Sequence, residues 1–468
     1  AARRRRPPRR VRAHTPRSAT IHRSVHASHG ETMAPATTFA QSARNEISLF
    51  AALVIVFGVV AARDQEQELY ELVSRLFWRT ASARPPVLII AILVGWAGVV
   101  RCAELAGLRL SRCIGEGVSP PKVICRAALG LLDIVLLCRL APFVAREVFG
   151  TEHFGRWCLL ADLVAYACCG FYLVAPPSGV FLSPEHAYDA ERCAAHVRYD
   201  HAAVLQTACS RASLFKTLVE SLCAPFAPVT FWHVIVADYA TSMAKAMGDM
   251  HVTTCVAWRG FASPVSTMDV DVHGVFWEET RGACVTSELN AYALALPFWC
   301  RLFQCLAVLR RTGEAKNFWN ACKYATAFPL VYAGYLDRLA PSEHTRRLVV
   351  GCAIIQSSAT FAWDLCMDWG LFKKRRGALL CGLFEPDQMR EPKSLVFSKK
   401  PDSFVYLAYG ALVLFNFSLR FAWALAVFGH VSTRGLGMLN FELAELARRT
   451  VWALFRIEWE YHERKWPL

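Results

Sequence analysis

Acidic and basic residues interrupt apolar stretches in the second half of this sequence. Asp364 and Asp368 are four residues apart, so in a helix both carboxylates face the same side. Glu445 precedes Arg448 by three residues and Arg449 by four, and can hold at least one of these guanidinium groups in position. A charge at the bilayer centre costs about 2.5–3.5 kcal/mol on insertion scales, so it persists when paired or when lining an aqueous path. Buried charge of this kind predicts either an ion path or ion pairs that hold helices together.

Three more cations lie in separate apolar blocks: Arg301, Lys323 and Arg420. Trp423 follows Arg420 by three residues, which would put an aromatic ring one helical turn from the guanidinium. Arginine binds tetrahedral oxyanions through two parallel hydrogen bonds, while lysine supplies a point charge. Acids such as Asp238 would orient the cations and keep the anion from binding too tightly to leave. Because so much buried charge is costly for packing alone, the pattern favours passage of a small, multiply charged oxyanion.

The elements that must position these residues are long apolar blocks, which predict about ten membrane-spanning helices. They centre on Ile47–Ala62, Val87–Leu105, Val123–Val144, Trp157–Ala175, Phe231–Met247, Leu289–Leu309, Phe318–Leu336, Leu348–Leu371, Tyr406–Phe428 and Leu436–Ile457. An amphipathic stretch, Ala202–Leu222, is expected at the membrane interface. We therefore expect an all-α polytopic membrane protein, with four spans in residues 46–177 and an interfacial helix followed by six spans in residues 178–468.

Composition excludes several other classes. With 54% hydrophobic and only 19% charged residues, the chain is neither a single soluble globule nor a disordered protein. Residues 1–45 hold ten Arg and one acid, and they account for most of the net charge of +14. The remainder is close to neutral, so no nucleic-acid partner is expected. We expect residues 1–45 to form a disordered tail that is either a targeting segment or, up to residue 32, translated upstream sequence.

Two further patterns concern the loops. Lys and Arg are concentrated on the side of the termini, most densely at Lys373–Arg376, so the positive-inside rule places both termini in the cytosol. None of the 18 Cys forms a CxxC pair or a cluster with zinc spacing, and neither a metal nor another cofactor is expected. Cys255 and Cys284 lie on a predicted outer loop, where the compartment permits a disulfide. The residues alone leave that pairing open.

Several motifs in the second half resemble the EXS family, in that family's order. They are Ala224–Phe226 with Phe231–Ser242, Leu296–Leu306 (LPFWCRLFQCL), Asn320–Phe328 (NACKYATAF), Trp363–Leu371 (WDLCMDWGL), Leu419–Ala424 (LRFAWA) and Arg448–Glu460 (RRTVWALFRIEWE). The family includes metazoan retrovirus-receptor phosphate exporters, plant root-to-shoot phosphate exporters and a fungal Golgi protein. The resemblance implies export of inorganic phosphate by ten transmembrane helices, with the path in the last six.

Carried over position by position, the resemblance also implies roles for individual residues. The residues implied to line the phosphate path are Asp238, Lys323, Tyr324, Asp364, Asp368, Arg420, Glu445, Arg448 and Arg449. Trp423 would be the aromatic gate, and the match favours a disulfide between Cys255 and Cys284. Two positions depart from the metazoan exporters, since Asn290 replaces an Arg and Thr241 replaces an Asn. Affinity or anion selectivity is expected to differ accordingly.

The resemblance leaves partners and location open. The larger exporters carry an N-terminal SPX domain that senses inositol pyrophosphates, whereas only about 45 residues precede the first predicted span here. A separate SPX-containing regulator and a homodimer are candidate partners beside phosphate and membrane lipid, and the membrane is the plasma membrane or the Golgi. Two rival functions stay open. One is a non-transporting Golgi scaffold that retains glycosylation enzymes, and the other is a membrane enzyme that uses Asp364 and Asp368 as an acidic or metal-binding dyad.

Overall fold

The computed structural model describes residues 81–114, 119–149, 154–174, 214, 216–224, 226–262, 275–371, 396–397, 401–427 and 436–464. Helices make up nearly all of these ranges, and no strand occurs in them, so the expected all-α class is confirmed. The predicted tail, the first predicted span, most of the interfacial stretch and the basic segment Lys373–Arg376 lie outside the described residues.

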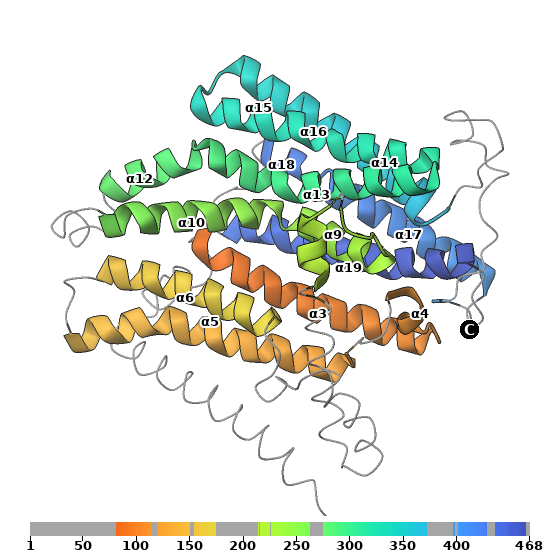
Figure 1. The fold of residues 1–468 in the computed structure, drawn as a ribbon, viewed down its shortest axis with the longest axis horizontal. Coiled ribbons are helices and arrows are strands. Elements are labelled where there is room, and N and C mark those ends of the chain that lie inside the picture. Colours follow the sequence, from red (N-terminus) through yellow and green to blue (C-terminus); the bar gives the residue numbers. More distant parts are fainter. Residues whose placement is uncertain are drawn as a thin grey trace, which may run out of the picture. The chain divides into compact units, whose positions relative to one another are not determined.

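The first described helices follow the predicted spans of the N-terminal half. A short turn, η2 (Ala81–Ala83), leads into α3 (Arg84–Leu105), which begins with two prolines at positions where an amide hydrogen has no helical partner. The short α4 (Leu110–Ile114), α5 (Pro121–Phe149) and α6 (Phe154–Val174) follow. Helix α5 packs against both α3 and α6 (Figure 1), and Leu131 and Val135 of α5 are buried in this contact.

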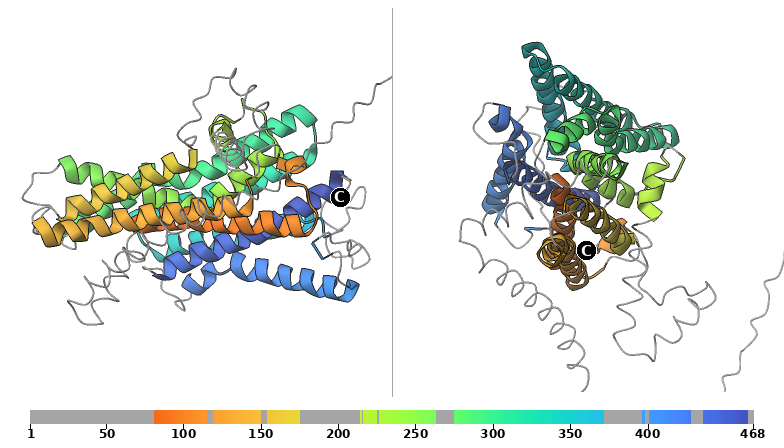
Figure 2. Two further views of the ribbon diagram at one scale, coloured as in Figure 1. Left: turned by 90° about the horizontal axis from the view of Figure 1, so that it is seen from below. Right: turned by 90° about the vertical axis from the view of Figure 1, so that its left-hand side faces the viewer.

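The second half supplies the remaining helices of the bundle. They are α9 (Phe231–Ser242), α10 (Ala244–Ala262), α12 (Val275–Val285), α13 (Glu288–Thr312), α14 (Ala315–Ala325), α15 (Ala327–Leu339), α16 (Glu343–Trp363), η3 (Asp364–Asp368), α17 (Asp402–Arg420), α18 (Trp423–Val427) and α19 (Leu436–Arg464). Helix α19 lies against α3, α9, α17 and η3, while α15 and α16 pack against each other farther from it (Figures 1 and 2).

Three predicted spans are divided where the sequence pattern suggested one helix each. The breaks fall at Met243 between α9 and α10, at Thr326 between α14 and α15, and at residues 421–422 between α17 and α18. Hydroxyl groups accompany two of them: Thr241 donates to the Asp238 carbonyl at 2.7 Å, and Thr326 donates to the Lys323 carbonyl at 2.6 Å. Such local bonds compete with regular helix geometry. Broken helices within a membrane are tolerated where the freed backbone is buried in protein or lines a cavity.

The end of α16 changes its helical geometry at the most charged motif. Residues 364–368 form a π-turn, in which the Trp369 amide donates to the Asp364 carbonyl five residues earlier at 2.9 Å. Gly370 then adopts φ +57°, and a β-carbon there would lie 2.4 Å from the Trp459 ring of α19. A glycine at this position therefore lets the chain turn and lets α19 approach the π-turn closely.

Four helical stretches within the described ranges are long and apolar enough to cross a membrane. They are Arg84–Leu105, Glu288–Thr312, Glu343–Asp368 and Ser403–Leu425. Their outward faces carry large exposed apolar side chains such as Ile355 and Leu414, which suits contact with lipid. The chain is thus an all-α membrane protein, while the total of about ten spans stays a prediction.

Candidate functional site

Asp364, at the start of the π-turn, is the acidic centre of one buried network. Its Oδ2 atom accepts hydrogen bonds from Arg420 Nη2 at 2.5 Å and Asn416 Nδ2 at 3.2 Å, both on α17. Arg448 of α19 adds a longer contact, with Nη1 3.4 Å from the same oxygen. Asp364 is only 2% exposed, so the three donors offset the cost of burying its charge.

All three guanidinium nitrogens of Arg448 donate hydrogen bonds. Its Nε and Nη2 atoms form a two-pronged pair with Glu445, at 2.7 and 2.5 Å, as the three-residue spacing predicted. Nη1 donates to the side-chain oxygen of Asn416 at 3.2 Å. With 1% exposure, Arg448 is a fixed cation whose orientation depends on Glu445 and Asn416.

Asp238, on α9, is the centre of a second network. Its Oδ1 accepts from Arg301 Nε at 2.8 Å and from the Tyr324 hydroxyl at 2.6 Å. Arg301 also donates to Tyr324 at 3.1 Å and to Gln304 at 2.7 Å, and Gln304 in turn donates to Ser221 at 3.1 Å. Three helices, α9, α13 and α14, are joined here by one buried carboxylate.

The helix end between α9 and α10 connects these two networks. Arg449 donates from Nε to the Ser242 hydroxyl at 3.0 Å and from Nη2 to Thr241 at 3.3 Å. Ser242 donates to Glu445 at 2.7 Å. A continuous chain of hydrogen bonds therefore runs from the backbone of Asp238 through Arg449 to Arg448, and the α9–α10 break supplies its middle.

Two buried cations of the described part form no ion pair with a carboxylate: Lys323 and Arg449. The Lys323 ammonium lies 4.0 Å from the Tyr324 ring centre and 5.2 Å from that of Trp363, while Asp368, Asp238 and Asp364 act on it from farther away. Arg449 lies 4.6 Å over the Trp452 ring. A buried cation without a contacting counterion is costly. The positive charges of these two residues are therefore not neutralised by a contacting carboxylate among the described residues.

Asp368 and Trp423 make their described hydrogen bonds outside the Asp238 and Asp364 networks. Asp368 also faces α19, but one turn or more beyond Asp364, where it accepts from Trp452 Nε1 at 3.1 Å and lies 3.6 Å from Arg456 Nε. Trp423 begins α18, after a break at residues 421–422, so it and Arg420 are not on one uninterrupted helix. Its indole nitrogen donates to Ser357 of α16 at 3.0 Å.

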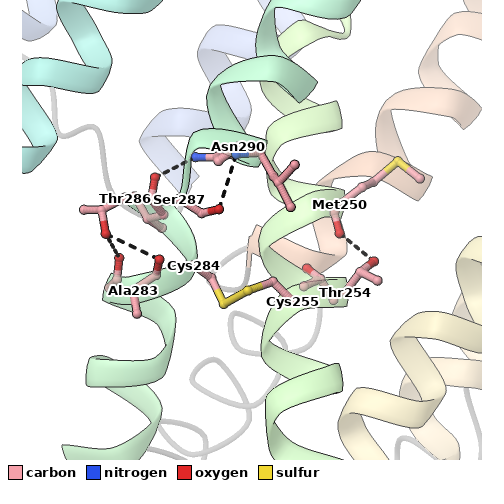
Figure 3. The surroundings of a disulfide bond; sticks show 12 residues. Met250, Thr254, Cys255, Ala283, Cys284, Thr286, Ser287 and Asn290 are labelled. Atoms are coloured by element: carbon pink, nitrogen blue, oxygen red, sulfur yellow. Dashed lines mark hydrogen bonds between the residues drawn. A yellow bond between two sulfur atoms is a disulfide. The ribbon is translucent and has the colours of Figure 1, made fainter.

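Cys255 and Cys284 are joined by a disulfide bond, with their Cα atoms 5.9 Å apart (Figure 3). Cys255 was expected on a loop but lies within α10, and Cys284 is on α12, so the bond links two helices. Nearby, Ser287 caps α13 by accepting from the Leu289 amide, and Asn290 donates to the Val285 carbonyl at 2.9 Å. The bond therefore fixes the junction at which α12 leads into α13.

Some residues of the networks were outside the predicted set. Arg301 was noted only as a cation, whereas Asn416, Gln304, Ser242 and Ser357 were not singled out. Asn416 was detectable, because it is the one amide in the apolar run of α17 and is 1% exposed. The serines carried no such signal, since isolated serines are common in apolar helices. The metal-dyad alternative lacks support in the described residues, where no three His, Cys, Asp or Glu side chains gather closely enough to hold a metal ion.

Fold and site together define a helical membrane protein whose interior carries arginine, lysine and carboxylate groups from several helices. The chain belongs to the EXS family, whose model matches residues 83–462. The match takes in the first described helices as well as the motifs of the second half.

Known proteins from animals and fungi are similar to the chain. It is 31% identical over 269 residues to solute carrier family 53 member 1 of Homo sapiens, which covers 54% of this chain and 36% of that protein. It is 30% identical over 264 residues to a xenotropic and polytropic retrovirus receptor 1 homolog of Danio rerio, covering 54% and 35%. Protein ERD1 homolog 2 of Schizosaccharomyces pombe is 27% identical over 240 residues, covering 48% and 53%. The chain thus matches about a third to a half of the length of these relatives.

Proposed function

We propose that this protein exports inorganic phosphate across a membrane through the bundle formed by α9, α13, α14, η3, α17 and α19. The observation that carries the proposal is the pair of buried cations, Lys323 and Arg449, that form no ion pair with a described carboxylate and act electrostatically on both Asp238 and Asp364. The EXS membership and the solute-carrier relative support transport as the class of activity. The expected phosphate-lining residues supply the chemistry, because arginine and lysine match phosphate oxygens.

Within this proposal, Asp364 occupies the position that an anion would compete for. Its Oδ2 takes hydrogen bonds from Arg420, Asn416 and Arg448, and a phosphate oxygen suits the same donors. Arg420 Nε is buried and has no hydrogen-bond partner within the described residues, which leaves a donor for the anion. Competition between carboxylate and phosphate keeps the anion from binding too tightly to leave.

The neighbouring residues have supporting roles in the proposal. Tyr324 would present its hydroxyl to phosphate once the anion draws it away from Asp238, while Asp368 and Glu445 hold Arg456 and Arg448 in place. Opening of the path requires Trp423 to leave Ser357, and this hydrogen bond is the contact that a gate would break. We keep both termini on the cytosolic side, in either the plasma membrane or the Golgi. A homodimer and a separate SPX-containing regulator remain part of the proposal.

The test is phosphate efflux from loaded proteoliposomes with Lys323→Gln and a matched control, Lys316→Gln. Both residues are on α14, but Lys316 is exposed and pairs with Glu314 at 3.1 Å. We expect Lys323→Gln to reduce efflux by roughly ten- to a hundredfold, the loss expected for one charged hydrogen bond, while Lys316→Gln retains it. Absence of efflux from the folded unmodified protein would overturn the proposal.

A Golgi scaffold remains the second candidate, favoured by the similarity to the S. pombe ERD1 homolog. A scaffold would tolerate Arg420→Ala and Arg448→Ala but would lose its partners when Lys373–Arg376 is replaced. A transporter would show the opposite pattern for the two arginines. Comparing enzyme retention and phosphate flux in the same variants separates the two functions.

A further inference from the structure

A second charged cluster lies where α3, α10 and α19 meet. Arg84 at the start of α3 is 2.7 Å from the Asp249 carboxylate of α10, measured from Nη2 to Oδ2. Lys245 of α10 also pairs with Asp249. Glu442 of α19 is the fourth member, with one oxygen 3.9 Å from Arg84 Nε. The side chains of Arg84, Asp249 and Glu442 are all more than nine-tenths buried, whereas Lys245 is 44% exposed.

The acids Asp238, Asp364 and Glu445 of the two networks and Asp249 of this cluster all accept hydrogen bonds. Glu442 accepts none among the described residues. Both carboxylate oxygens are buried without a donor among the described residues. Its neighbours on the same face of α19, Leu439 and Leu446, are buried against Leu88 of α3 and Ala246 of α10. A buried carboxylate ion without hydrogen-bond donors is expensive, and protonation would relieve that cost.

The two cations that face Glu442, Arg84 and Lys245, are paired mainly with another acid, Asp249. From α3 the facing charge is Arg84, and from α10 the facing charges are Lys245 and Asp249. Both cations contact Asp249 more closely than they contact Glu442. On α19 itself, Glu445 accepts hydrogen bonds from Arg448 and Ser242. The cluster of four is neutral when Glu442 is ionised and carries one net positive charge when it is protonated.

The cluster lies next to the Asp364 network, because Glu442 is about one helical turn before Glu445 on α19. Ser242, which ends α9 and links the Asp238 and Asp364 networks, comes just before Lys245 and Asp249 in sequence. Cys255 follows these two residues on α10. Along α10 the cluster therefore lies between these networks and the disulfide.

We propose that Glu442 is a proton-binding residue and that its protonation is coupled to the binding of phosphate at Arg84 and Lys245, beside the proposed path. The inference rests on the proposed function. Proton uptake gives this cluster one net positive charge, so an anion binds there more tightly. By linkage, a bound anion favours the proton on Glu442 to the same degree. No bond other than that to the proton forms or breaks.

Infrared difference spectroscopy of the full chain tests the proton site without any transport. Adding inorganic phosphate to the unmodified protein should produce a carboxylic-acid carbonyl band that is missing in Glu442→Gln and returns, shifted, in Glu442→Asp. Glu104→Gln is the control, since Glu104 is an exposed residue of α3 that pairs only with Arg101 in the described part. A band that persists in Glu442→Gln would overturn the assignment.

Efflux from proteoliposomes tests the coupling. Phosphate itself changes charge near neutral pH, so the pH dependence of the Glu442→Gln variant serves as the baseline. Relative to that baseline, the efflux rate of the unmodified protein should fall by a factor of about three to ten as the pH rises and Glu442 ionises. The reason is that ionisation removes one unit of positive charge from the cluster. Identical pH profiles in the two proteins would overturn the coupling, whereas absence of efflux from both would instead overturn the proposed function.

Discussion

At the scale of single residues, the interior of this protein contains two kinds of buried charge. Arg448 and Arg301 are held by carboxylates, amides or hydroxyls, and they behave as parts of the scaffold. Lys323 and Arg449 lie over aromatic rings without a contacting carboxylate among the described residues. The sequence predicted that these residues would gather, because each interrupts an apolar block. It could not separate the fixed cations from the unpaired ones, since that depends on partners far away in the chain.

Asn416 offers a test of the scaffold. Replacing it with Ala removes the amide that joins Asp364 to Arg448 and leaves two buried charged groups each with one partner fewer. We expect the free energy of unfolding to fall by about 1–3 kcal/mol and efflux to fall with it. The midpoint of thermal unfolding in detergent, followed by tryptophan fluorescence, measures the first effect.

Asn317→Ala is the matched control for Asn416, because Asn317 is only half-buried and its side chain makes one hydrogen bond among the described residues, to Thr312 at 3.3 Å. A similar loss of stability in both variants would show that the Asp364–Arg448 link has no special role.

At the scale of elements, the breaks in the helices position the site. Ser242, Tyr324 and Arg420 each lie within the last turn of a helix that ends inside a predicted span. Apolar length predicted where the spans are but not where they divide, because the Thr241 and Thr326 hydroxyl bonds that accompany two divisions are not visible in hydropathy. The π-turn at Asp364 was not foreseen for the same reason. The spacing of four residues between the two acids is equally compatible with an ordinary helix.

Gly370 is the position at which an element can be disturbed most selectively. A side chain there meets the Trp459 ring and an unfavourable φ of +57°, so Gly370→Ala should destabilise the protein by about 1–3 kcal/mol. Gly351→Ala, in α16 with open space around it, should be neutral or stabilising by up to about 1 kcal/mol. Thermal unfolding of the two variants side by side measures the difference, and equal midpoints would contradict this account of the turn.

At the scale of the whole molecule, α19 is the element on which the rest depends. It contacts α3, α9, α17 and the π-turn, and it provides Glu442, Glu445, Arg448 and Arg449. A β-carbon at Gly95 of α3 would lie 2.5 Å from the Thr450 hydroxyl, so the two helices approach closely just beside the arginine pair. Membership in the EXS family and the membrane class were predictable from the motifs and the apolar blocks. The resemblance also favoured the Cys255–Cys284 disulfide, but its location between two helices was not predicted, because Cys255 had been expected on a loop.

The disulfide yields a prediction about the assembled chain. It closes a segment with a sequence separation of 29 residues, for which loop-closure entropy gives about 3–4 kcal/mol of stabilisation. Reduction should lower the unfolding midpoint of the unmodified protein and leave that of the Cys255→Ser/Cys284→Ser variant unchanged. Cys322→Ser, which replaces an exposed free thiol, should respond to reduction like the unmodified protein. Equal responses in all three would mean that the bond adds no stability.

The π-turn also affects how relatives of this chain should be aligned. Such a turn accommodates one residue more than an ordinary helical turn, and a helix advances about 100° per residue. An alignment that opens a single gap between Asp364 and Asp368 would therefore rotate one of these acids by about that angle. Asp364 or Asp368 would then be matched with a neighbouring position that does not face its arginine. Comparisons of this motif between relatives are sound only when both acids are anchored to their own arginine.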